Sequence, residues 1–132
     1  MASSRMVVDS SIFIEFLRAS DKTKTTLYQL PDDTELFLSV VTLYELLMGA
    51  TDEVKKRDVK LLTEPLIILP FTKSVAEKSA EVYHDLRQRN KMIEFRDIFI
   101  GATSLVHGLP VLTKNTKHFE RIDGLTLAKI KK

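Results

Sequence analysis

The sequence predicts an α/β fold in which a parallel sheet of four or five strands is flanked by helices on both faces. Short apolar segments alternate along the chain with segments of helical periodicity. The apolar segments are continuous, which is typical of strands buried on both faces of a sheet. At 132 residues, the chain has the usual length of one compact domain. We therefore expect a single three-layer domain over residues 6–132, with residues 1–5 as a short polar tail.

The N-terminal half contains two strand–helix pairs and a further helix. Residues 6–9 are a short apolar run, and residues 12–17 then place apolar side chains at helical spacing. After a polar segment, residues 36–39 form a second apolar run, and the leucines within 41–49 predict a helix that ends near a glycine. The charged residues 52–60 are typical of an exposed helix face.

The C-terminal half continues this alternation. Residues 66–69 predict a third strand from their β-branched content, and a stripe of apolar positions between 72 and 90 predicts a long amphipathic helix. A further helix is expected over 95–107, capped by the glycine that follows it. Residues 110–113 predict the fourth strand, and residues 125–128 are a candidate fifth. Strands and helices that alternate in this way build a parallel sheet with helices on its faces.

The composition excludes several kinds of function. The chain has no cysteine, which rules out disulfides, thiolate nucleophiles and cysteine-based zinc sites. Its formal net charge of +2 is compatible with a polyanionic partner without requiring one. No apolar run approaches the roughly 20 residues that span a bilayer, and no signal peptide is visible. We expect a cytoplasmic protein without a membrane segment, whose chemistry depends on carboxylates, hydroxyls, amides or histidines.

Acidic and polar residues follow the predicted strands at their carboxyl ends, where ligands bind in open α/β sheets. Asp9 ends the first strand, and Glu45 lies about one turn into the helix after the second strand. Thr113 and Asn115 follow the fourth strand, and Asp97 opens the helix that leads to it. Asp9, Glu45 and Asp97 are therefore expected to meet at one rim of the sheet.

Three carboxylates at close range predict a bound divalent cation. Like charges within a few ångströms force one group to take up a proton unless a cation neutralises them. Mg²⁺ and Mn²⁺ prefer oxygen ligands, commonly one or two carboxylates together with phosphate oxygens. Such a site activates water and neutralises charge on a phosphodiester, so no histidine base is required. We predict Mg²⁺ or Mn²⁺ bound by Asp9, Glu45 and Asp97.

Each of these acids also has a structural interpretation. Asp9 or Ser10 could cap the helix after the first strand, and Asp97 could cap the helix that it opens. The stretch 42–45, Thr-Leu-Tyr-Glu, matches a capping box in which the glutamate bonds back to the threonine amide. The apolar residues around Glu45 favour the cation site, because a carboxylate packed on a sheet is costly without a counter-charge.

Other polar residues are open to two interpretations. Glu94 could support the site from beyond the direct ligands, but a charge in a loop is more often solvated. His84 and His107 have no second ligand at metal-binding spacing and are interpreted as structural. Three basic runs could touch phosphates or could form solvated faces: 55–57, 114–118 and 129–132.

Five segments together form a recognisable pattern. They are Val7-Val8-Asp9-Ser10-Ser11, Ser39 to Gly49 with Glu45, Asp97-Ile98-Phe99-Ile100-Gly101-Ala102, Leu112-Thr113-Lys114-Asn115 and His118-Phe119. In this order and spacing they resemble the PIN-domain toxins usually called VapC. The resemblance covers nearly the whole chain from Met6 onward, and it is most specific from Asp97 to the Gly-Leu pair at 124–125.

The resemblance implies a PIN-like three-layer fold and a Mg²⁺- or Mn²⁺-dependent endoribonuclease that cleaves RNA with an activated water. By position, Asp9 and Asp97 would hold metal, Glu45 would support metal or water, and Thr113 or Asn115 would complete the pocket. Family members typically form homodimers and are silenced by a small antitoxin encoded beside them, whose tail enters the active-site groove. The implied partners are therefore RNA, a second copy and a cognate antitoxin.

One departure from the family pattern concerns the charge of the pocket. Many PIN domains carry a fourth acid at or near the positions of Asn115 and His118, and neither is a carboxylate here. The lower negative charge predicts that one metal dominates without RNA. It also motivates an alternative function, a PIN-like RNA- or protein-binding module without catalysis. A phosphoacceptor receiver domain is a further alternative, although two serines, and not a second acid, follow Asp9.

Overall fold

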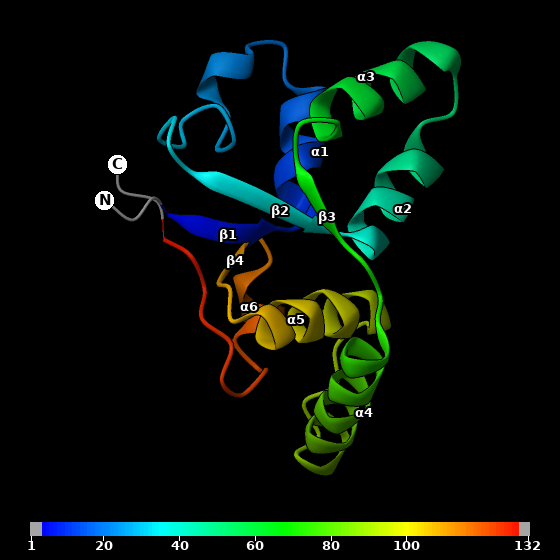
Figure 1. Cartoon of the computed structure of the whole chain (residues 1–132), viewed down its shortest axis with the longest axis vertical. Coiled ribbons are helices and arrows are strands. Elements are labelled where there is room, and N and C mark those ends of the chain that lie inside the picture. The colour runs from blue at the N-terminus through cyan, green and yellow to red at the C-terminus, as the bar shows by residue number, and fades with distance from the viewer. Residues whose placement is uncertain (1–3, 130–132) are drawn as a thin grey trace.

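The computed structural model describes residues 4–129 and has a four-stranded parallel sheet at its centre (Figure 1). The strands are β1 (Arg5–Val8), β2 (Glu35–Ser39), β3 (Ile67–Leu69) and β4 (Val111–Leu112). They lie in the order β3-β2-β1-β4, and each neighbouring pair is parallel. The predicted parallel sheet is confirmed, with four strands.

Helices cover both faces of this sheet, which confirms the predicted three layers (Figure 1). One face carries α1 (Ser10–Arg18), α2 (Val40–Gly49) and α3 (Glu53–Thr63), and the other carries α4 (Lys73–Gln88), α5 (Phe95–His107) and α6 (Thr116–Phe119). A short 3-10 helix, η1 (Lys22–Lys24), lies between α1 and β2 in the chain. Within residues 4–129, no helix combines the length and the hydrophobicity that a membrane crossing requires.

The helix over 95–107 has the predicted limits, and its end shows how the glycine cap works. Gly108 adopts the left-handed conformation, with a φ of 64°, directly after α5. Its N–H and that of Leu109 bond back to carbonyls of the last turn of α5. Glycine reaches this conformation without the steric cost that other residues carry, so the chain can turn sharply into β4.

Two cores lie on the two sides of the sheet, because successive side chains of a strand point to opposite faces. Met6 and Val8 of β1 pack into a core with α1, α2 and α3, which includes the fully buried Ile12 and Phe13. Val7 packs into the opposite core, which α4, α5 and α6 complete. Burial on both faces explains why the first strand is a continuous apolar run.

The first strand begins earlier than the sequence predicts. Arg5 was expected to belong to the polar tail, but it is the first residue of β1. Its guanidinium pairs with Glu35 of β2 at 2.8 Å and lies over the ring of Phe37. A polar residue can occupy this position because it is exposed at the end of the strand. Residues 1–3 of the expected tail lie outside the described part of the chain.

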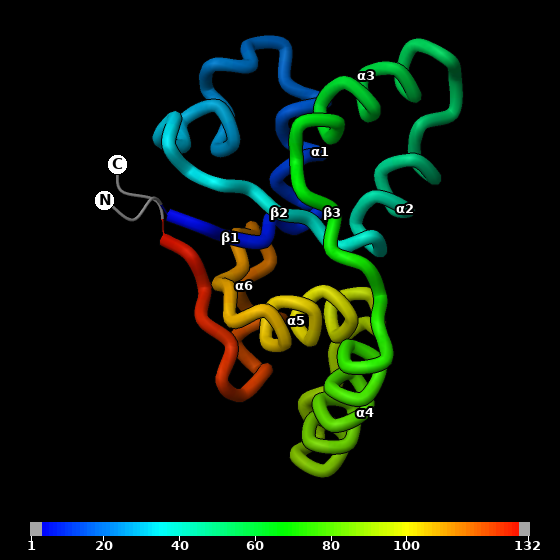
Figure 2. Tube along the Cα trace, viewed as in Figure 1, coloured from blue at the N-terminus to red at the C-terminus, as the bar shows by residue number. Residues whose placement is uncertain are grey.

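The candidate fifth strand is not a full strand. Residues 125–128 make only a single parallel bridge, between Leu127 and Val111. Val111 donates to the carbonyl of Thr126 and accepts from the N–H of Ala128. Figure 2 shows this last segment, in red, returning alongside the sheet. Since β4 itself has only two residues, it offers the returning chain too few partners for a longer ladder.

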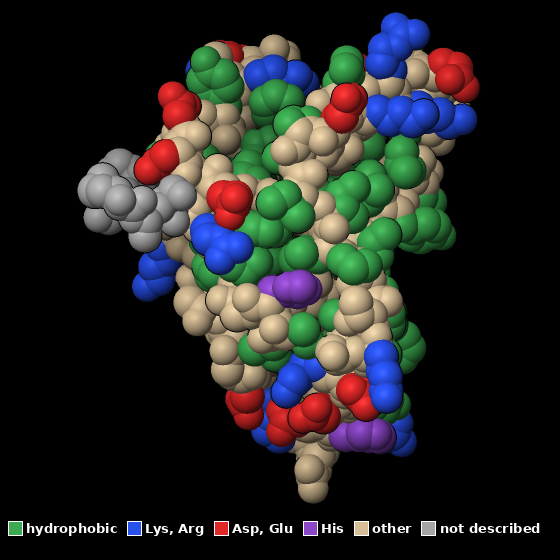
Figure 3. All heavy atoms as spheres, viewed as in Figure 1, with side chains coloured by type: hydrophobic (Ala, Val, Ile, Leu, Met, Phe, Trp, Pro, Cys, Tyr) green, Lys and Arg blue, Asp and Glu red, His purple; other side chains and the backbone are tan. Residues whose placement is uncertain are grey.

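The edge strand β3 is more exposed than a fully covered parallel strand would be. Ile67 and Ile68 are 46% and 40% exposed, and only Leu69 is buried. Figure 3 shows hydrophobic side chains gathered over the region where Figure 1 draws β3 and α2. The apolar content of this segment therefore predicts a strand correctly but does not show that helices cover both of its faces.

The strand order places a topological switch point between β1 and β4. From β1 the chain builds β2 and β3 toward one edge, whereas β4 lies on the other side of β1. Connections that leave the carboxyl ends of two such strands diverge, and a crevice forms between them. Asp9 and Thr113 directly follow these two strands and therefore lie at the crevice.

Candidate active site

A cavity of about 190 Å³ lies at this crevice. Its lining includes the three acids that the sequence predicts at one rim, Asp9, Glu45 and Asp97. Asp9 follows β1 in the sheet, Glu45 comes from α2 on one face, and Asp97 comes from α5 on the other face (Figure 1). All three layers of the fold thus contribute one carboxylate to the same cavity.

Asp9 is held by hydroxyl groups from two elements. It occupies the N-cap position of α1 but makes no capping hydrogen bond, so the capping interpretation is wrong for its side chain. Ser11 and Thr113 donate to Oδ2 of Asp9, at 2.9 and 2.7 Å. Ser10, which lies inside α1, reaches Oδ1 only at 3.4 Å. The carboxylate of Asp9 is therefore oriented by both chain segments that border the crevice.

Asp97 lies in the first turn of α5, where the helix dipole favours a negative charge. The N-cap residue is Glu94, so Asp97 does not cap this helix as one interpretation expected. Oδ2 of Asp97 contacts Nδ1 of His118 at 2.9 Å. Burial raises the pKa of Asp97, the hydrogen bond with His118 opposes this shift, and the charge of Asp9 adds to it.

Glu45 does not belong to a capping box, and the expectation for 42–45 is wrong. Helix α2 begins at Val40, and its N-cap is Ser39 at the end of β2. The Ser39 hydroxyl accepts the N–H of Val41 at 3.0 Å. Because this serine already caps the helix, the threonine of the expected box lies inside α2 and is fully buried. Glu45 is therefore free to project from the helix into the cavity.

Of the three acids, Glu45 is the one with a buried carboxylate oxygen that no hydrogen bond satisfies among the described residues. Its side chain is 11% exposed, and Oε2 pairs with Arg96 at 3.2 Å. Oε1 is buried and has no hydrogen-bond partner among the described residues. Burial raises the pKa of Glu45, Arg96 opposes the shift, and the charges of Asp9 and Asp97 add to it. The Ser10 hydroxyl also lowers this pKa, although it lies outside hydrogen-bonding geometry of Oε1.

Arg96 is a site residue that the sequence analysis missed. Its guanidinium bonds Glu45 at 3.2 Å and Glu94 at 2.8 Å, and half of its side chain is exposed at the cavity. Glu94 is 58% exposed and pairs with this arginine, and its charge also raises the pKa of Asp97. The sequence feature that points to Arg96 is its position directly before Asp97, but the sequence does not show which acid its side chain reaches.

Asn115 lines the cavity and reaches the acids through His118. Its Nδ2 lies 3.1 Å from Nδ1 of His118, the atom that contacts Asp97. Sequence comparison with the family pattern identifies His118 only as a position without an acid. Its contact with Asp97 depends on how the chain turns after β4, which no local pattern specifies.

The other basic and histidine residues lie mostly outside this lining. Lys114 pairs with Glu15 at 2.7 Å, which gives it a structural role beside the crevice. His84 and His107 are exposed on α4 and α5 and do not line the cavity. Of the basic run at 129–132, residues 130–132 lie outside the described part of the chain.

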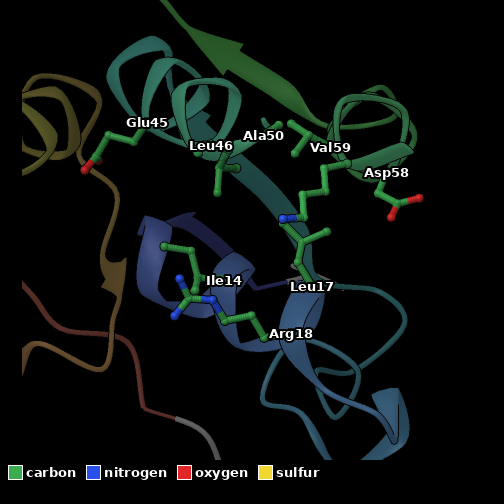
Figure 4. Close-up of a pocket in the computed structure, with 10 residues that line it drawn as sticks. Ile14, Leu17, Arg18, Glu45, Leu46, Ala50, Asp58 and Val59 are labelled. Atoms are coloured by element: carbon green, nitrogen blue, oxygen red, sulfur yellow. The ribbon is translucent and has the colours of Figure 1, made fainter. Parts of the chain in front are cut away.

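Two further hollows meet the acidic cavity at Glu45. One, of about 250 Å³, lies between α1, α2 and α3, and Figure 4 shows Glu45 at one end of it, with its carboxylate directed toward α5. Its lining mixes apolar and charged side chains, among them Ile14, Leu17, Arg18, Leu46, Lys55 and Asp58. The other, of about 440 Å³, is almost entirely apolar and includes Val40, Tyr44, Met48 and Phe99.

The donor atoms of the acidic cavity fit a hard divalent cation. Three carboxylates supply the oxygen ligands that Mg²⁺ and Mn²⁺ prefer, and the buried Oε1 of Glu45 lacks any other partner among residues 4–129. As the described side chains stand, no three acids or histidines form a ready metal cluster. Glu45 is turned to Arg96 and Asp97 to His118. Ion binding therefore requires the carboxylate oxygens that these contacts leave free to move closer together.

Comparison with known proteins identifies the family of this chain. A model of the PIN domain matches residues 6–125. The chain belongs to the PIN-domain family. This PIN domain is 31% identical over 128 residues to ribonuclease VapC1 of Rickettsia felis, and the match covers 91% of this chain and 92% of that relative.

Solved structures of the same fold include toxin–antitoxin complexes. The PIN domain matches a chain of VapBC-1 from nontypeable Haemophilus influenzae with a TM-score of 0.80 and 25% identity, over 94% of this chain and 96% of the other. It matches a chain of a toxin–antitoxin complex from Klebsiella pneumoniae with a TM-score of 0.70 and 26% identity, over 92% and 95% of the two chains. The similarity thus extends over almost the full length of both chains in each case.

Proposed function

We propose that this PIN domain is a Mg²⁺- or Mn²⁺-dependent endoribonuclease that acts in the cytoplasm as the toxin of a toxin–antitoxin pair. The observation that carries the proposal is the meeting of three buried or half-buried acids in one cavity, with one buried Glu45 oxygen left without a partner among the described residues. The relative from Rickettsia felis, which is named a ribonuclease, supports RNA as the substrate.

Asp9, Glu45 and Asp97 would hold the cation, and Asn115 would complete the polar wall of the pocket. When bound, the ion would lower the pKa of a water molecule and neutralise charge on the scissile phosphodiester. The protein prepares for this by orienting Asp9 with two hydroxyls. Arg96 offsets the charge of Glu45, so that the buried carboxylate is tolerated before an ion arrives.

Two surface regions support the proposed binding of an antitoxin and of a second copy of the chain. The hollow between α1, α2 and α3 ends at Glu45 (Figure 4), so an antitoxin segment seated in it would reach the acids. The apolar hollow of about 440 Å³ adjoins a third hollow of about 400 Å³, because Phe99 lines both. The third hollow is also lined by Phe71, Tyr83 and Phe95. A continuous apolar face of this kind is typical of an interface, and we assign it to the homodimer.

Incubation of purified protein with a mixed cellular RNA pool tests the proposal. We expect cleavage with Mg²⁺ or Mn²⁺, none with EDTA, and none by Asp9→Asn, which keeps the side-chain shape but removes the charge. Asp33→Asn, at an exposed position outside the cavity, is the matched control and should cleave normally. Cleavage that persists in EDTA would contradict the metal dependence.

The two alternative functions give different results in the same experiments. A binding module without catalysis would bind RNA but leave it intact, even with Mn²⁺ bound. A receiver domain would leave RNA intact and would be labelled at Asp9 by a small phosphodonor. The missing fourth acid is the only motive for the binding module, and no observation favours the receiver domain. All three core acids line one cavity, which argues against both alternatives.

The free protein is expected to bind one Mn²⁺ ion per chain. Asp9, Glu45 and Asp97 line the proposed site together with Glu94, and Arg96 already offsets part of their charge. A second dication at the same place would therefore meet too little negative charge without the phosphates of RNA. Calorimetric titration with Mn²⁺ in the absence of RNA measures the stoichiometry, and two tight sites would contradict this prediction.

A further inference from the structure

His118 is placed beside Asp97 by a short helix that is anchored in the core. Helix α6 has only four residues, and its last residue, Phe119, is fully buried in the core beneath the sheet. This anchor presents the neighbouring His118 to the cavity side, with one third of its side chain exposed. Nδ1 of His118 lies 2.9 Å from Oδ2 of Asp97, whose side chain is only 8% exposed.

The hydrogen bonds around Nδ1 define which partner donates. Asn115 Nδ2 lies 3.1 Å from Nδ1, and Asp97 Oδ2 lies 2.9 Å from the same atom. One ring nitrogen cannot accept from Asn115 and donate to Asp97 at the same time. An ionised Asp97 needs a donor, so we assign the hydrogen to Nδ1. This tautomer requires the amide of Asn115 to be flipped, so that its oxygen and not its nitrogen faces the ring.

The three acids of the cavity share one pattern of hydrogen bonds. In each acid one oxygen is held by a neighbouring side chain: Oδ2 of Asp9 by Ser11 and Thr113, Oε2 of Glu45 by Arg96, and Oδ2 of Asp97 by His118. The other oxygen of Asp9 has only a 3.4 Å contact from Ser10, and the other oxygen of Glu45 has no partner among the described residues. Asp9 and Glu45 are thus each arranged to offer a single oxygen to an ion, and the contact of His118 with Oδ2 points to the same arrangement in Asp97.

From this pattern we infer that His118 is a positioning residue for Asp97: its Nδ1–H holds Oδ2, so that Oδ1 is the oxygen that meets the cation. The inference rests on the proposed function, because it assigns His118 a role toward the metal site. Side chains that orient a ligand in this way typically change metal affinity by about 10–100-fold when they are removed. His118 does for Asp97 what the hydroxyls of Ser11 and Thr113 do for Asp9.

Mn²⁺ titration of the RNA-free protein tests this role with a readout other than activity. His118→Ala removes the donor and should weaken Mn²⁺ binding by about 10–100-fold. His118→Asn places an amide nitrogen where Nδ1 lies and should restore affinity close to that of the unchanged protein. His118→Gln places its amide where Nε2 lies and should bind as weakly as His118→Ala. Glu120→Gln, an exposed position of the same loop region, is the control for a general change of charge.

Thermal unfolding in EDTA verifies that the variants are folded, and the comparison of Asn with Gln holds even if the alanine variant is unstable. Unchanged Mn²⁺ affinity in both His118→Ala and His118→Gln would overturn the inference. Equal weakening in His118→Asn and His118→Gln would also overturn it, because the imidazole itself would then be required. A protein that cleaves RNA and binds Mn²⁺ normally in all variants would refute only the role of His118. Failure of the unchanged protein to bind Mn²⁺ would refute the proposed function as well.

Discussion

Replacing Asp97 with asparagine is expected to abolish RNA cleavage and, at the same time, to stabilise the protein in the absence of divalent cations. Cleavage should fall by at least about 10²-fold, the scale on which one preorganised electrostatic group acts. Stability should rise because burial of the carboxylate raises its pKa. The amide keeps the shape of the side chain and can still accept the hydrogen bond from His118.

The pH dependence of this stabilisation follows from the direction of the pKa shift. A carboxyl whose pKa is higher in the folded than in the unfolded state binds its proton more tightly when folded. Its favourable contribution is present below the unfolded pKa of about 3.9 and is lost as the pH rises through the folded pKa. The difference between Asp97→Asn and the unchanged protein should therefore be small near pH 4 and largest at neutral pH. The pKa of Glu45 is raised as well, so Glu45 acts in the same direction.

Thermal unfolding in EDTA and in Mn²⁺, at acidic and neutral pH, measures both effects. Mn²⁺ at 100 times its dissociation constant should stabilise the unchanged protein by about 2.7 kcal/mol and should add much less to Asp97→Asn. Asp33→Asn serves again as the control, because its side chain is exposed. A variant that is less stable than the unchanged protein in EDTA at neutral pH would show that the Asp97 charge stabilises the fold.

Leu86→Ala is expected to lower the free energy of unfolding by about 2–5 kcal/mol. Leu86 is fully buried in α4 and belongs to the core that α4, α5 and α6 form against the sheet. Truncation removes buried methyl groups and leaves a cavity that the close-packed surroundings fill only in part. Leu86 does not line the acidic cavity, so cleavage well below the unfolding temperature should persist.

The chain offers a matched control for this substitution. Leu61 lies in α3, two residues before its last residue, as Leu86 does in α4, but Leu61 is 63% exposed. Both changes alter helix propensity at equivalent positions, and only one of them empties a core site. Leu61→Ala should change the free energy of unfolding by no more than about 0.5 kcal/mol. Urea denaturation measures both values, and equal losses would contradict the burial of Leu86.

Local patterns in the sequence predicted those features that depend on neighbours along the chain. The continuous apolar run of β1 predicts a buried strand, and its two-sided burial confirms this. Helical spacing and the following glycine predict the limits of α5, which are confirmed. The positions of the acids at strand ends predict a shared cavity, since the carboxyl ends of parallel strands meet at one edge.

The errors occurred where local patterns compete with tertiary contacts. The stretch 42–45 matches a capping box, but Ser39 caps α2 because β2 ends there. Residues 125–128 have a strand-like composition, but the two-residue β4 offers them a single bridge. The same limit explains why Arg5 was placed outside the sheet, since its partner Glu35 lies 30 positions away.

By itself, the sequence determined the order of strands and helices and the acids Asp9, Glu45 and Asp97 as candidate ligands, because these depend on residue types and their spacing. Only the tertiary structure decided which oxygen of each acid is held and by which neighbour. The contacts of Arg96 with Glu45 and of His118 with Asp97 join residues from different elements. The first pair is set by helices packed on the two faces of the sheet, and the second by the packing of α6 beside α5 on one face. In both, burial makes an unpaired carboxylate costly.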